Sequence, residues 1–330
     1  MQEKMNQMLR LAQLHHATDI HFVMKKEKLS VSMRGLYGME EIYSPALDAS
    51  LFHYLKYLSN LDLGNLSVPQ SGNFQYTYEG NLLYFRFSLL TTLHMQTAVL
   101  RILNNHSEIE LKDLTKDQAQ LQSFMNWTKT RSGLIVLSGP TGSGKTTTLH
   151  AILHQIANDH HLQVVSLEDP IEIFDDSYLQ LQINEKNNFS YEEGIKQLMR
   201  HDPDVIMIGE IRDPSSARML LRSALSGHLI FTTIHAKSCS EAIKRLNEFG
   251  LSNEELTHTL SAIVNQRLYP SANGKGRVCI YEIMEKEELQ YCLAHGQSKK
   301  TYRDISANIC AAVSKGWIKE KDASYDLVTE

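Results

Sequence analysis

The sequence has few cysteines, no long apolar run and no excess of positive charge, and each absence excludes a class of protein. No stretch approaches the roughly 18 apolar residues that span a bilayer. The net charge of −5 argues against a molecule-wide basic surface for nucleic acid. The cysteines are too scattered for a disulfide framework or a zinc site of closely spaced ligands, so we expect no zinc. They are Cys239, Cys279, Cys292 and Cys310.

The proportions of apolar and charged residues are those of a globular protein. The chain has 330 residues, of which 42% are apolar and 22% charged, and this length favours roughly two domains. Near its start, four apolar residues recur at helical spacing among charged ones, namely Met5, Met8, Leu9 and Ala12. This pattern is typical of an amphipathic helix and not of a signal peptide. We therefore expect the protein in the cytoplasm.

Histidine is abundant, with 15 residues, so metal binding has to be considered. His150 and His154 are four residues apart in a predicted helix, a spacing at which two histidines can share a metal ion. Ala151, however, occupies the place of the glutamate in the H-E-x-x-H pattern. We interpret both histidines as polar surface groups.

Two strand pairs are predicted in the first third of the chain. Apolar residues alternate with polar ones at 20–22 and 29–33, on either side of a charged turn, which indicates one hairpin. Residues 72–90 alternate around Gly80 and Asn81, which we take as the turn of a second hairpin. Both hairpins are therefore assigned to a sheet.

A helix is predicted between these hairpins, at residues 47–63, because its apolar residues have helical spacing. The polar stretch 104–118 that follows the second hairpin is the best linker candidate. We therefore divide the chain into a small α+β N-terminal domain, residues 1–104, and a second domain, residues 105–330.

The second domain shows a different pattern, in which short apolar runs alternate with helical segments. The runs lie in GLIVLSG, QVVSLED, DVIMIGE and HLIFTTIH. Such an alternation predicts a parallel sheet with crossover helices. From about residue 254 onward we expect a mostly helical and polar C-terminal part.

The segment GPTGSGKTTTL lies between the first apolar run and a predicted helix. It satisfies the pattern G-x-x-x-x-G-K-[ST], whose glycines let backbone N–H groups surround phosphates at the start of a helix. Lys145 is expected to reach the β- and γ-phosphates, and Thr146 to offer its hydroxyl to Mg²⁺. We therefore predict a nucleotide site made by nine residues: Gly139, Pro140, Thr141, Gly142, Ser143, Gly144, Lys145, Thr146 and Thr147.

Acidic residues end two of the other apolar runs. Glu168 follows one run, in LEDPIE, and Glu210 follows the next, in IGEIRD. Since the carboxyl ends of parallel strands share one edge of a sheet, we expect Lys145, Glu168 and Glu210 to converge on one phosphate site. Helix capping and solvation are alternative roles for these acids, because Pro170 and Pro214 follow as helix starters.

Two histidines, His228 and His235, bracket the last predicted strand. A histidine at a strand end often has only a structural role. Beside a phosphate-binding sheet, however, the two are candidates for sensing the γ-phosphate.

Four segments in this order carry a resemblance to a known family. GPTGSGKTTTL, EDPIE, RHDPDVIMIGEIRD and SGHLIFTTIH resemble the Walker A, Asp-box, Walker B and His-box segments of the secretion ATPases of type II secretion and type IV pilus systems. The resemblance extends over nearly the whole chain. It implies an α/β fold, with a RecA-like P-loop ATPase domain preceded by the small α+β domain. It also implies ATP and Mg²⁺ as cofactors, and ATP hydrolysis coupled to mechanical work.

The resemblance also assigns roles to individual residues. Glu210 matches the Walker B acid, which holds Mg²⁺ together with Thr146, and Glu168 matches the acid of the Asp-box. The two acids would act on Mg²⁺ and the attacking water, and which of them is the base stays open. His228 and His235 match the His-box histidines near the nucleotide.

Two arginines outside the P-loop domain, Arg86 and Arg101, match arginines that in this family reach from the N-terminal domain to the nucleotide. The resemblance further implies a homo-hexamer at the cytoplasmic face of the membrane. Its partner would be a polytopic membrane platform protein that handles pilin subunits.

Departures from the family pattern narrow the expected subgroup. Many members carry a zinc-binding tetracysteine insert after the QRL segment, and this sequence passes residues 266–268 without it. The pilus retraction group carries a C-terminal helix to which nothing in residues 305–327 corresponds. The resemblance therefore favours the subgroup that assembles a competence pseudopilus for DNA uptake.

Three alternative functions are weighed against this one. The first is a pilus retraction ATPase. The second is a nucleic-acid translocase of RecA-like fold, which the net charge of −5 and the lack of a basic–aromatic stretch disfavour. The third is a scaffold that binds nucleotide without useful turnover, which the presence of both Glu168 and Glu210 disfavours.

Overall fold

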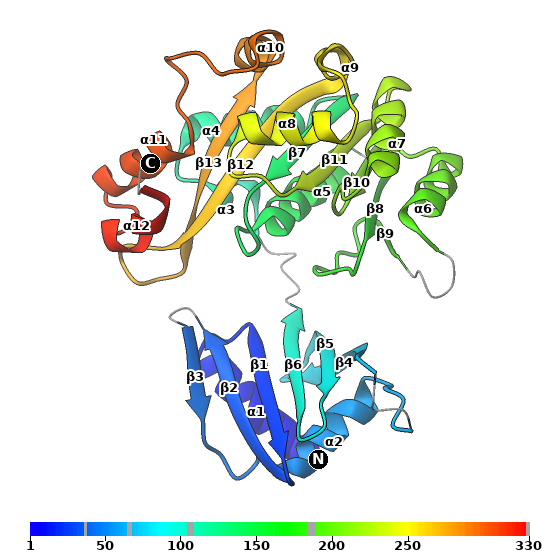
Figure 1. The fold of residues 1–330 in the computed structure, drawn as a ribbon, viewed down its shortest axis with the longest axis vertical. Helices are drawn as coiled ribbons and strands as arrows, with labels where there is room; N and C mark the ends of the chain where they lie inside the picture. Colours follow the sequence, from blue (N-terminus) through cyan, green and yellow to red (C-terminus); the bar gives the residue numbers. More distant parts are fainter. Residues whose placement is uncertain (36–37, 65–67, 104–108, 161, 184–188, 328–330) are drawn as a thin grey trace. The chain divides into compact units, whose positions relative to one another are not determined.

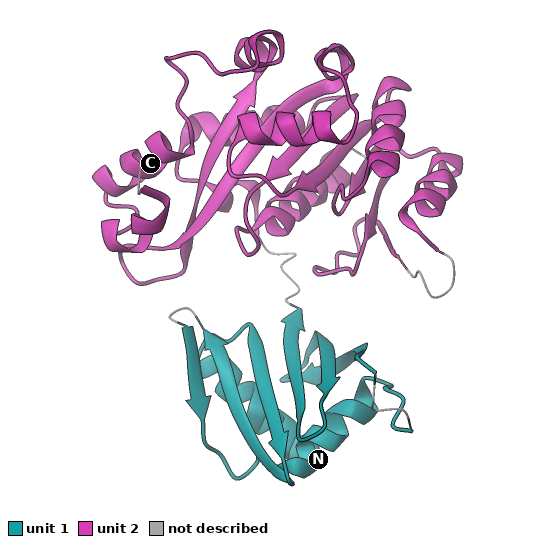
Figure 2. Ribbon diagram, in the orientation of Figure 1, with its two compact units in different colours: residues 1–105 teal, residues 106–330 magenta. Residues whose placement is uncertain are grey.

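The computed structural model describes residues 1–35, 38–64, 68–103, 109–160, 162–183 and 189–327. The chain forms two compact units, residues 1–105 and 106–330 (Figure 2). The expected boundary at residue 104 and the start of the expected linker lie outside the described residues. In the described part of the chain, no helix is long and apolar enough to cross a membrane.

Unit 1 is an antiparallel sheet with the strand order β3-β2-β1-β6-β5-β4 (Figure 1). Helices α1 and α2 share one hydrophobic core with this sheet, because their apolar residues pack against Phe22, Phe85 and Phe87. The elements are α1 (Gln2–Leu14), β1 (Asp19–Lys25), β2 (Lys28–Gly35), β3 (Gly38–Ile42), α2 (Ala49–Leu58), β4 (Gln70–Tyr78), β5 (Asn81–Thr91) and β6 (Gln96–Leu103).

The helices and hairpins predicted for unit 1 are present. The apolar residues predicted for the first helix are buried in α1, and α2 starts where the Asp48 carboxylate accepts a hydrogen bond from the Leu51 N–H at 3.1 Å. The predicted turn of the second hairpin is wrong by one residue. Tyr78 pairs with Asn81, so Glu79 and Gly80 form the turn, both with positive φ.

Unit 2 is built on a sheet with the order β13-β12-β7-β11-β10-β8-β9, in which β13 is antiparallel to β12 and the other pairs are parallel. The strands are β7 (Gly133–Ser138), β8 (Val164–Glu168), β9 (Leu179–Gln182), β10 (Val205–Ile208), β11 (Leu229–Ile234), β12 (Leu260–Pro270) and β13 (Arg277–Glu285). The four runs read from the sequence are β7, β8, β10 and β11, so the parallel sheet is confirmed.

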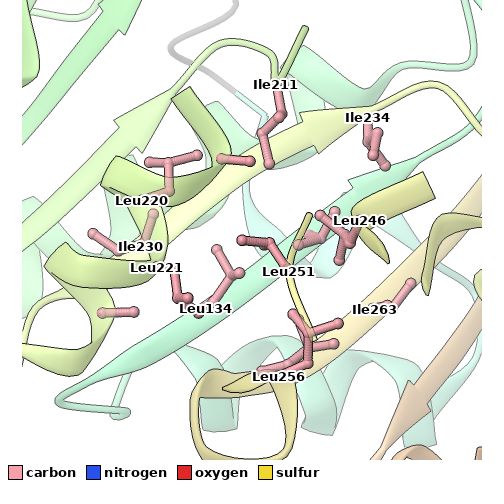
Figure 3. Close-up of a cluster of buried hydrophobic side chains, with 14 of the residues drawn as sticks. Leu134, Ile211, Leu220, Leu221, Ile230, Ile234, Leu246, Leu251, Leu256 and Ile263 are labelled. Atoms are coloured by element: carbon pink, nitrogen blue, oxygen red, sulfur yellow. The ribbon is translucent and has the colours of Figure 1, made fainter. Parts of the chain in front are cut away.

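Helices cover both faces of this sheet. On one face, α3 (Leu111–Leu114), α4 (Gln118–Trp127) and α5 (Lys145–His160) pack in a core that includes Ile135. On the other face, the neighbouring residue Leu134 packs in a second core with helices α7 (Pro214–Leu225) and α8 (Cys239–Glu248), as Figure 3 shows for Leu220 and Leu246. Adjacent residues of β7 enter different cores because side chains alternate along a strand. The remaining helices are α6 (Tyr191–Leu198), η2 (Met199–His201), α9 (Asn253–Thr259), α10 (Lys286–His295), α11 (Ile305–Ser314) and α12 (Glu320–Leu327).

The prediction of a mostly helical C-terminal part is wrong for residues 260–285. These residues form β12 and β13, and β12 lies inside the sheet between β7 and β13. The strand signal is hidden because β12 buries polar residues, Asn265 and Gln266, among its apolar ones. Helices α10, α11 and α12 follow and agree with the prediction.

The parallel strands bring sequence-distant residues to one edge of the sheet. Gly139 follows β7, Asp169 follows β8, Gly209 follows β10 and His235 follows β11. Their carboxyl ends lie together because neighbouring strands are parallel and in register. This is the edge at which open α/β sheets bind ligands.

Candidate nucleotide-binding site

The loop between β7 and α5 has a backbone that glycine makes accessible. Gly139, Gly142 and Gly144 have φ values of 145°, 79° and 87°, a region that other residues rarely adopt. A Cβ atom on Gly139 would also lie 2.6 Å from the Gln266 carbonyl oxygen. The loop ends at the N-terminus of α5, a helix of 16 residues, where free N–H groups and the helix dipole favour an anion.

Lys145 is the first residue of α5 and folds back over this loop. Its ammonium group donates hydrogen bonds to the carbonyl oxygens of Gly139, at 3.0 Å, and Pro140, at 3.1 Å. Burial lowers the pKa of Lys145, and the negative charges of Glu210 and Glu172 oppose this shift. The lysine is thus a partly desolvated cation that a phosphate would stabilise.

Strand β12 supports the loop from the side. The Gln266 side-chain amide donates a hydrogen bond to the Ser143 carbonyl oxygen at 2.7 Å. Asn265 donates to the Ser138 hydroxyl at 2.8 Å and to the Ala236 carbonyl oxygen at 3.0 Å. The Ser143 hydroxyl is buried and has no hydrogen-bond partner among the described residues. This orphaned hydroxyl and the glycine backbone fit a phosphate group, so the loop suits the nucleotide that the sequence predicts.

Glu210 lies at the same edge, just beyond β10. Its carboxylate accepts a hydrogen bond from the Arg212 Nε at 3.0 Å, and its Oε1 lies 3.4 Å from the Nε2 of His235. The side chain is 23% exposed, so it is open to a ligand. Arg212 also donates to Asp169 at 3.3 Å, and the bond to Glu210 raises the pKa of this arginine. The single positive charge of Arg212 is therefore shared between the two acids.

Glu168 does not join this cluster. It is 2% exposed, and its carboxylate accepts a hydrogen bond from Ser166 at 2.7 Å and lies 3.3 Å from the Nε2 of His150. The expected convergence of Glu168 with Lys145 and Glu210 is therefore not observed. The reason is that the last side chain of β8 is buried against His150 of α5.

A second acid of the same segment, Glu172, lies near enough to Lys145 for its charge to act on the lysine. Glu172 lies in the loop 169–178, here called the acid loop, and is exposed. Its charge acts on the pKa of Lys145 together with that of Glu210. Glu172 is not among the site residues predicted from the sequence. The signal that could have found it is that an acid four residues beyond a buried strand is free to face the ligand.

The two histidines that bracket β11 lie at opposite ends of the strand. His235 follows the strand and lies beside Glu210, as expected. His228 precedes the strand, and its Nδ1 lies 3.1 Å from both the Ser223 carbonyl oxygen and the Ser226 hydroxyl. The structure of unit 2 therefore does not bring His228 to the phosphate loop, because the two ends of a strand lie on opposite edges of a sheet.

The other predicted ligands of the loop have the expected surroundings. Pro140 and Thr141 are exposed, and Thr146 and Thr147 are half-buried in the first turn of α5. Among the described residues, no group of three or more histidine, cysteine, aspartate or glutamate side chains could hold a metal ion. A magnesium ion here would therefore need oxygen atoms from the nucleotide besides those of Thr146 and Glu210.

In unit 1, Arg86 and Arg101 lie directly opposite each other on β5 and β6. The Arg101 Nε donates a hydrogen bond to the Asp19 carboxylate at 2.8 Å, and its side chain remains 53% exposed. Like charges directly opposite on neighbouring strands repel each other, so the pair would be stabilised by an anion.

The sheet, the glycine-lined loop and Lys145 define this protein as a P-loop ATPase. The sequence model of the family described as Type II/IV secretion system protein matches residues 1–323, and the chain belongs to this family.

Similar proteins agree with this assignment. The competence protein ComGA of Bacillus subtilis (strain 168) is 31% identical over 93% of this chain and 92% of its own length. ComGA of Halalkalibacterium halodurans is 32% identical over 93% of each chain. The predicted resemblance is confirmed.

Solved structures share the fold along nearly the whole chain. The pilus retraction motor PilT with bound ADP superimposes with a TM-score of 0.74 at 25% identity, over 97% of this chain and 95% of that one. The ATPase DotB of Legionella pneumophila has a TM-score of 0.78 at 20% identity, over 98% and 95%. The predicted RecA-like ATPase domain with a preceding α+β domain is confirmed.

Proposed function

We propose that the protein is the ATP-hydrolysing motor that powers assembly of a type IV pilus-like competence pseudopilus for DNA uptake. The observation that carries this proposal is the likeness to two ComGA competence proteins along 93% of the chain. The motor acts as a homo-hexamer at the cytoplasmic face of the membrane and contacts a polytopic membrane platform protein. It needs ATP and Mg²⁺ and no structural zinc.

The phosphate loop and Lys145 hold the nucleotide in this proposal. Residues 139–147 offer backbone N–H groups and hydroxyls to the phosphates, and Lys145 exchanges its two carbonyl partners for phosphate oxygens. Thr146 and Glu210 hold Mg²⁺, which neutralises the charge on the β- and γ-phosphates. The carboxylates at this edge then orient and deprotonate the attacking water, and Glu172 has the exposure for this step that Glu168 lacks.

His235 and Arg212 complete the site in this proposal. His235 lies next to Glu210 and is placed to respond to the γ-phosphate. Arg212 holds Glu210 and Asp169 together and would have to release one of them when Mg²⁺ binds. His228 keeps its predicted role only if another subunit of the hexamer brings a nucleotide to the opposite edge of the sheet.

The arginine pair of unit 1 couples the nucleotide to movement in this proposal. Arg86 and Arg101 present two guanidinium groups from one face of a sheet, with Asp19 as a counter-charge for the second. Planar guanidinium groups make bidentate bonds to phosphate that vanish when the phosphate leaves. ATP would therefore close the N-terminal domain on the site, and hydrolysis would release it.

Arg86→Ala and Arg101→Ala are each expected to lower turnover by at least about tenfold, at the low end of arginine-finger effects. The affinity for ADP should barely change, because ADP lacks the γ-phosphate that the arginines contact. Steady-state ATPase assays and a fluorescent ADP titration measure the two quantities. Arg10→Ala, on the exposed side of α1, is the matched control. An equal collapse of ADP binding would mean that both arginines are structural.

Transformation of living cells tests the proposed function directly. Cells that lack the protein should take up no DNA and assemble no pseudopili, and the wild-type gene but not a Lys145→Ala gene should restore both. Affinity capture from solubilised membranes should retain a polytopic integral protein. Restoration by the Lys145→Ala gene would refute an ATP-driven motor.

The likeness to PilT favours pilus retraction as the second candidate. The two functions differ in what a deletion strain shows. Loss of an assembly motor leaves cells without filaments, whereas loss of a retraction motor leaves filaments that persist. A nucleic-acid translocase would instead show ATPase activity that rises with added DNA, and we expect no such rise.

A further inference from the structure

Two histidines of α5 contact the acid loop, although neither belongs to the phosphate-binding pattern. His150 and His154 lie one helical turn apart, five and nine residues beyond Lys145 in the sequence. Their contacts are made to Glu168, which precedes the acid loop, and to residues 175–178 at its end. The sequence interpretation of His150 as a polar surface group is wrong, because it is only 3% exposed.

His150 joins the two ends of the acid loop. Its Nε2 lies 3.3 Å from the Glu168 carboxylate, and its Nδ1 is hydrogen-bonded to the Tyr178 hydroxyl. A carboxylate can only accept, so the Nε2–H donates to Glu168 and the Nδ1 accepts from the phenol. Burial and the nearby charge of Glu168 raise the pKa of Tyr178, which keeps this donor protonated. The chain from Tyr178 through His150 to Glu168 therefore satisfies every ring nitrogen.

His154 holds the second half of the loop. Its Nδ1 lies 2.7 Å from the Asp175 carboxylate and 3.3 Å from the Ser177 hydroxyl. Asp175 in turn accepts hydrogen bonds from the Ser177 N–H at 2.9 Å and from its hydroxyl at 2.6 Å. Gln180 holds the middle of the loop, because its side-chain amide donates a hydrogen bond to the Ile173 carbonyl oxygen at 2.8 Å. The helix is thus bonded to the loop at three successive points.

The loop that is held this way carries two acids of the site. Asp169 shares Arg212 with Glu210, and the charge of Glu172 acts on Lys145. The same helix, α5, starts at Lys145, the residue proposed to contact the phosphates, so the nucleotide acts directly on the start of this helix. A displacement of α5 relative to the acid loop would change the distance between the phosphates and these acids. Reactions that depend on geometry lose about 100-fold for a displacement near 1 Å.

We propose that His150 and His154 are positioning residues, a histidine clamp that holds the acid loop in a fixed place relative to the P-loop helix. This inference rests on the proposed role of Glu172 and Asp169 in hydrolysis. Apolar side chains at these places would avoid the cost of burying a carboxylate and an imidazole. Directional hydrogen bonds instead hold the loop at a defined position, which is the property that a catalytic acid needs.

His150→Phe tests the clamp because phenylalanine keeps the ring and removes both nitrogen atoms. We expect kcat to fall by about tenfold or more, with the KM for ATP and the affinity for ADP within about twofold of the wild-type values. Hydrogen exchange should become faster in residues 169–178 and stay unchanged in β7 and β11. His258→Phe, at an exposed position of α9, is the matched control.

Amide variants separate the two arms of the clamp. His150→Gln places its amide nitrogen near the former Nε2 and keeps the bond to Glu168, whereas His150→Asn places its amide oxygen near the former Nδ1 and keeps the bond to Tyr178. Each should recover part of the lost kcat. Tyr178→Phe should lower kcat less than His150→Phe, and the double variant should be no worse than His150→Phe alone, because both changes break one network.

The clamp proposal is contradicted if folded His150→Phe keeps the wild-type kcat or if its affinity for ADP falls as much as its kcat. It is also contradicted if neither amide variant recovers activity. Should His150→Phe fail to fold, Tyr178→Phe and His154→Leu test the same contacts, and wild-type kcat in both overturns the clamp. Failure of the proposed function looks different. It would appear as a wild-type protein without ATP turnover, or as activity that survives Lys145→Ala.

Discussion

Replacing Lys145 by alanine is expected to abolish ATP turnover while the fold stays intact. The change removes the one cation of the phosphate loop, whose ammonium group is held by the carbonyl oxygens of Gly139 and Pro140. Losing one preorganised donor to a developing charge typically costs on the order of 10²–10³ in kcat. Lys145 supplies a full positive charge to the phosphates, so its loss should lower kcat by at least as much. A coupled assay of phosphate release measures the effect.

The fold should survive because Lys145 makes no core contact, and substitutions away from the core usually change stability by only about 0.5 kcal/mol. The melting temperature of Lys145→Ala should therefore match that of Lys275→Ala, a control at an exposed turn. The control should keep full activity. ATPase activity near the wild-type rate in Lys145→Ala would show that the loop is not the nucleotide site.

Glu210→Gln is expected to bind Mg-ATP and to hydrolyse it about 100-fold or more slowly, within the range of lost general-base catalysis. The amide has the same shape as the carboxylate but can neither accept a proton nor bind Mg²⁺ as a charged ligand. Binding of a fluorescent ATP analogue and single-turnover hydrolysis separate the two steps. Glu254→Gln, at an exposed position, is the control and should leave both unchanged.

The same measurement decides between Glu168 and Glu172, the two glutamates of this segment. Glu172→Gln should slow hydrolysis as Glu210→Gln does, because Glu172 is exposed and its charge reaches Lys145. Glu168→Gln should lower the melting temperature and slow hydrolysis less, since Glu168 is buried against His150 and Ser166. Full turnover in both Glu210→Gln and Glu172→Gln would remove these carboxylates from the mechanism. A block in Glu168→Gln at an unchanged melting temperature would return the base to Glu168.

Short segments of the sequence were enough to determine the phosphate loop and the parallel strands. The phosphate loop is a turn of a few residues that includes Gly139, Gly144 and Lys145. The conformations that such a turn can adopt depend mostly on the residues within it. Buried parallel strands are likewise recognisable as continuous apolar runs, because helices cover both faces of the sheet. For the same reason the family was recognisable from four ordered segments.

Other features depended on residues that lie far apart in the sequence. β12 was not predicted because its polar residues are buried in contacts with other segments, among them the phosphate loop and Ser138, which lie more than 100 residues earlier. The burial of Glu168 was not predicted because a strand end does not reveal which side of the sheet its last side chain faces. The burial of His150 results from the packing of α5 against Tyr178 and Glu168, which its own helix does not reveal.

The sequence by itself predicts the parallel sheet and the phosphate loop through local conformational preferences and apolar periodicity, and its four ordered segments indicate the family through their resemblance. Only the tertiary structure decided which acid is buried, which end of β11 lies beside Glu210 and what the two histidines of α5 contact. Those properties depend on the direction of side chains across packed elements, and packing is set by the whole core at once.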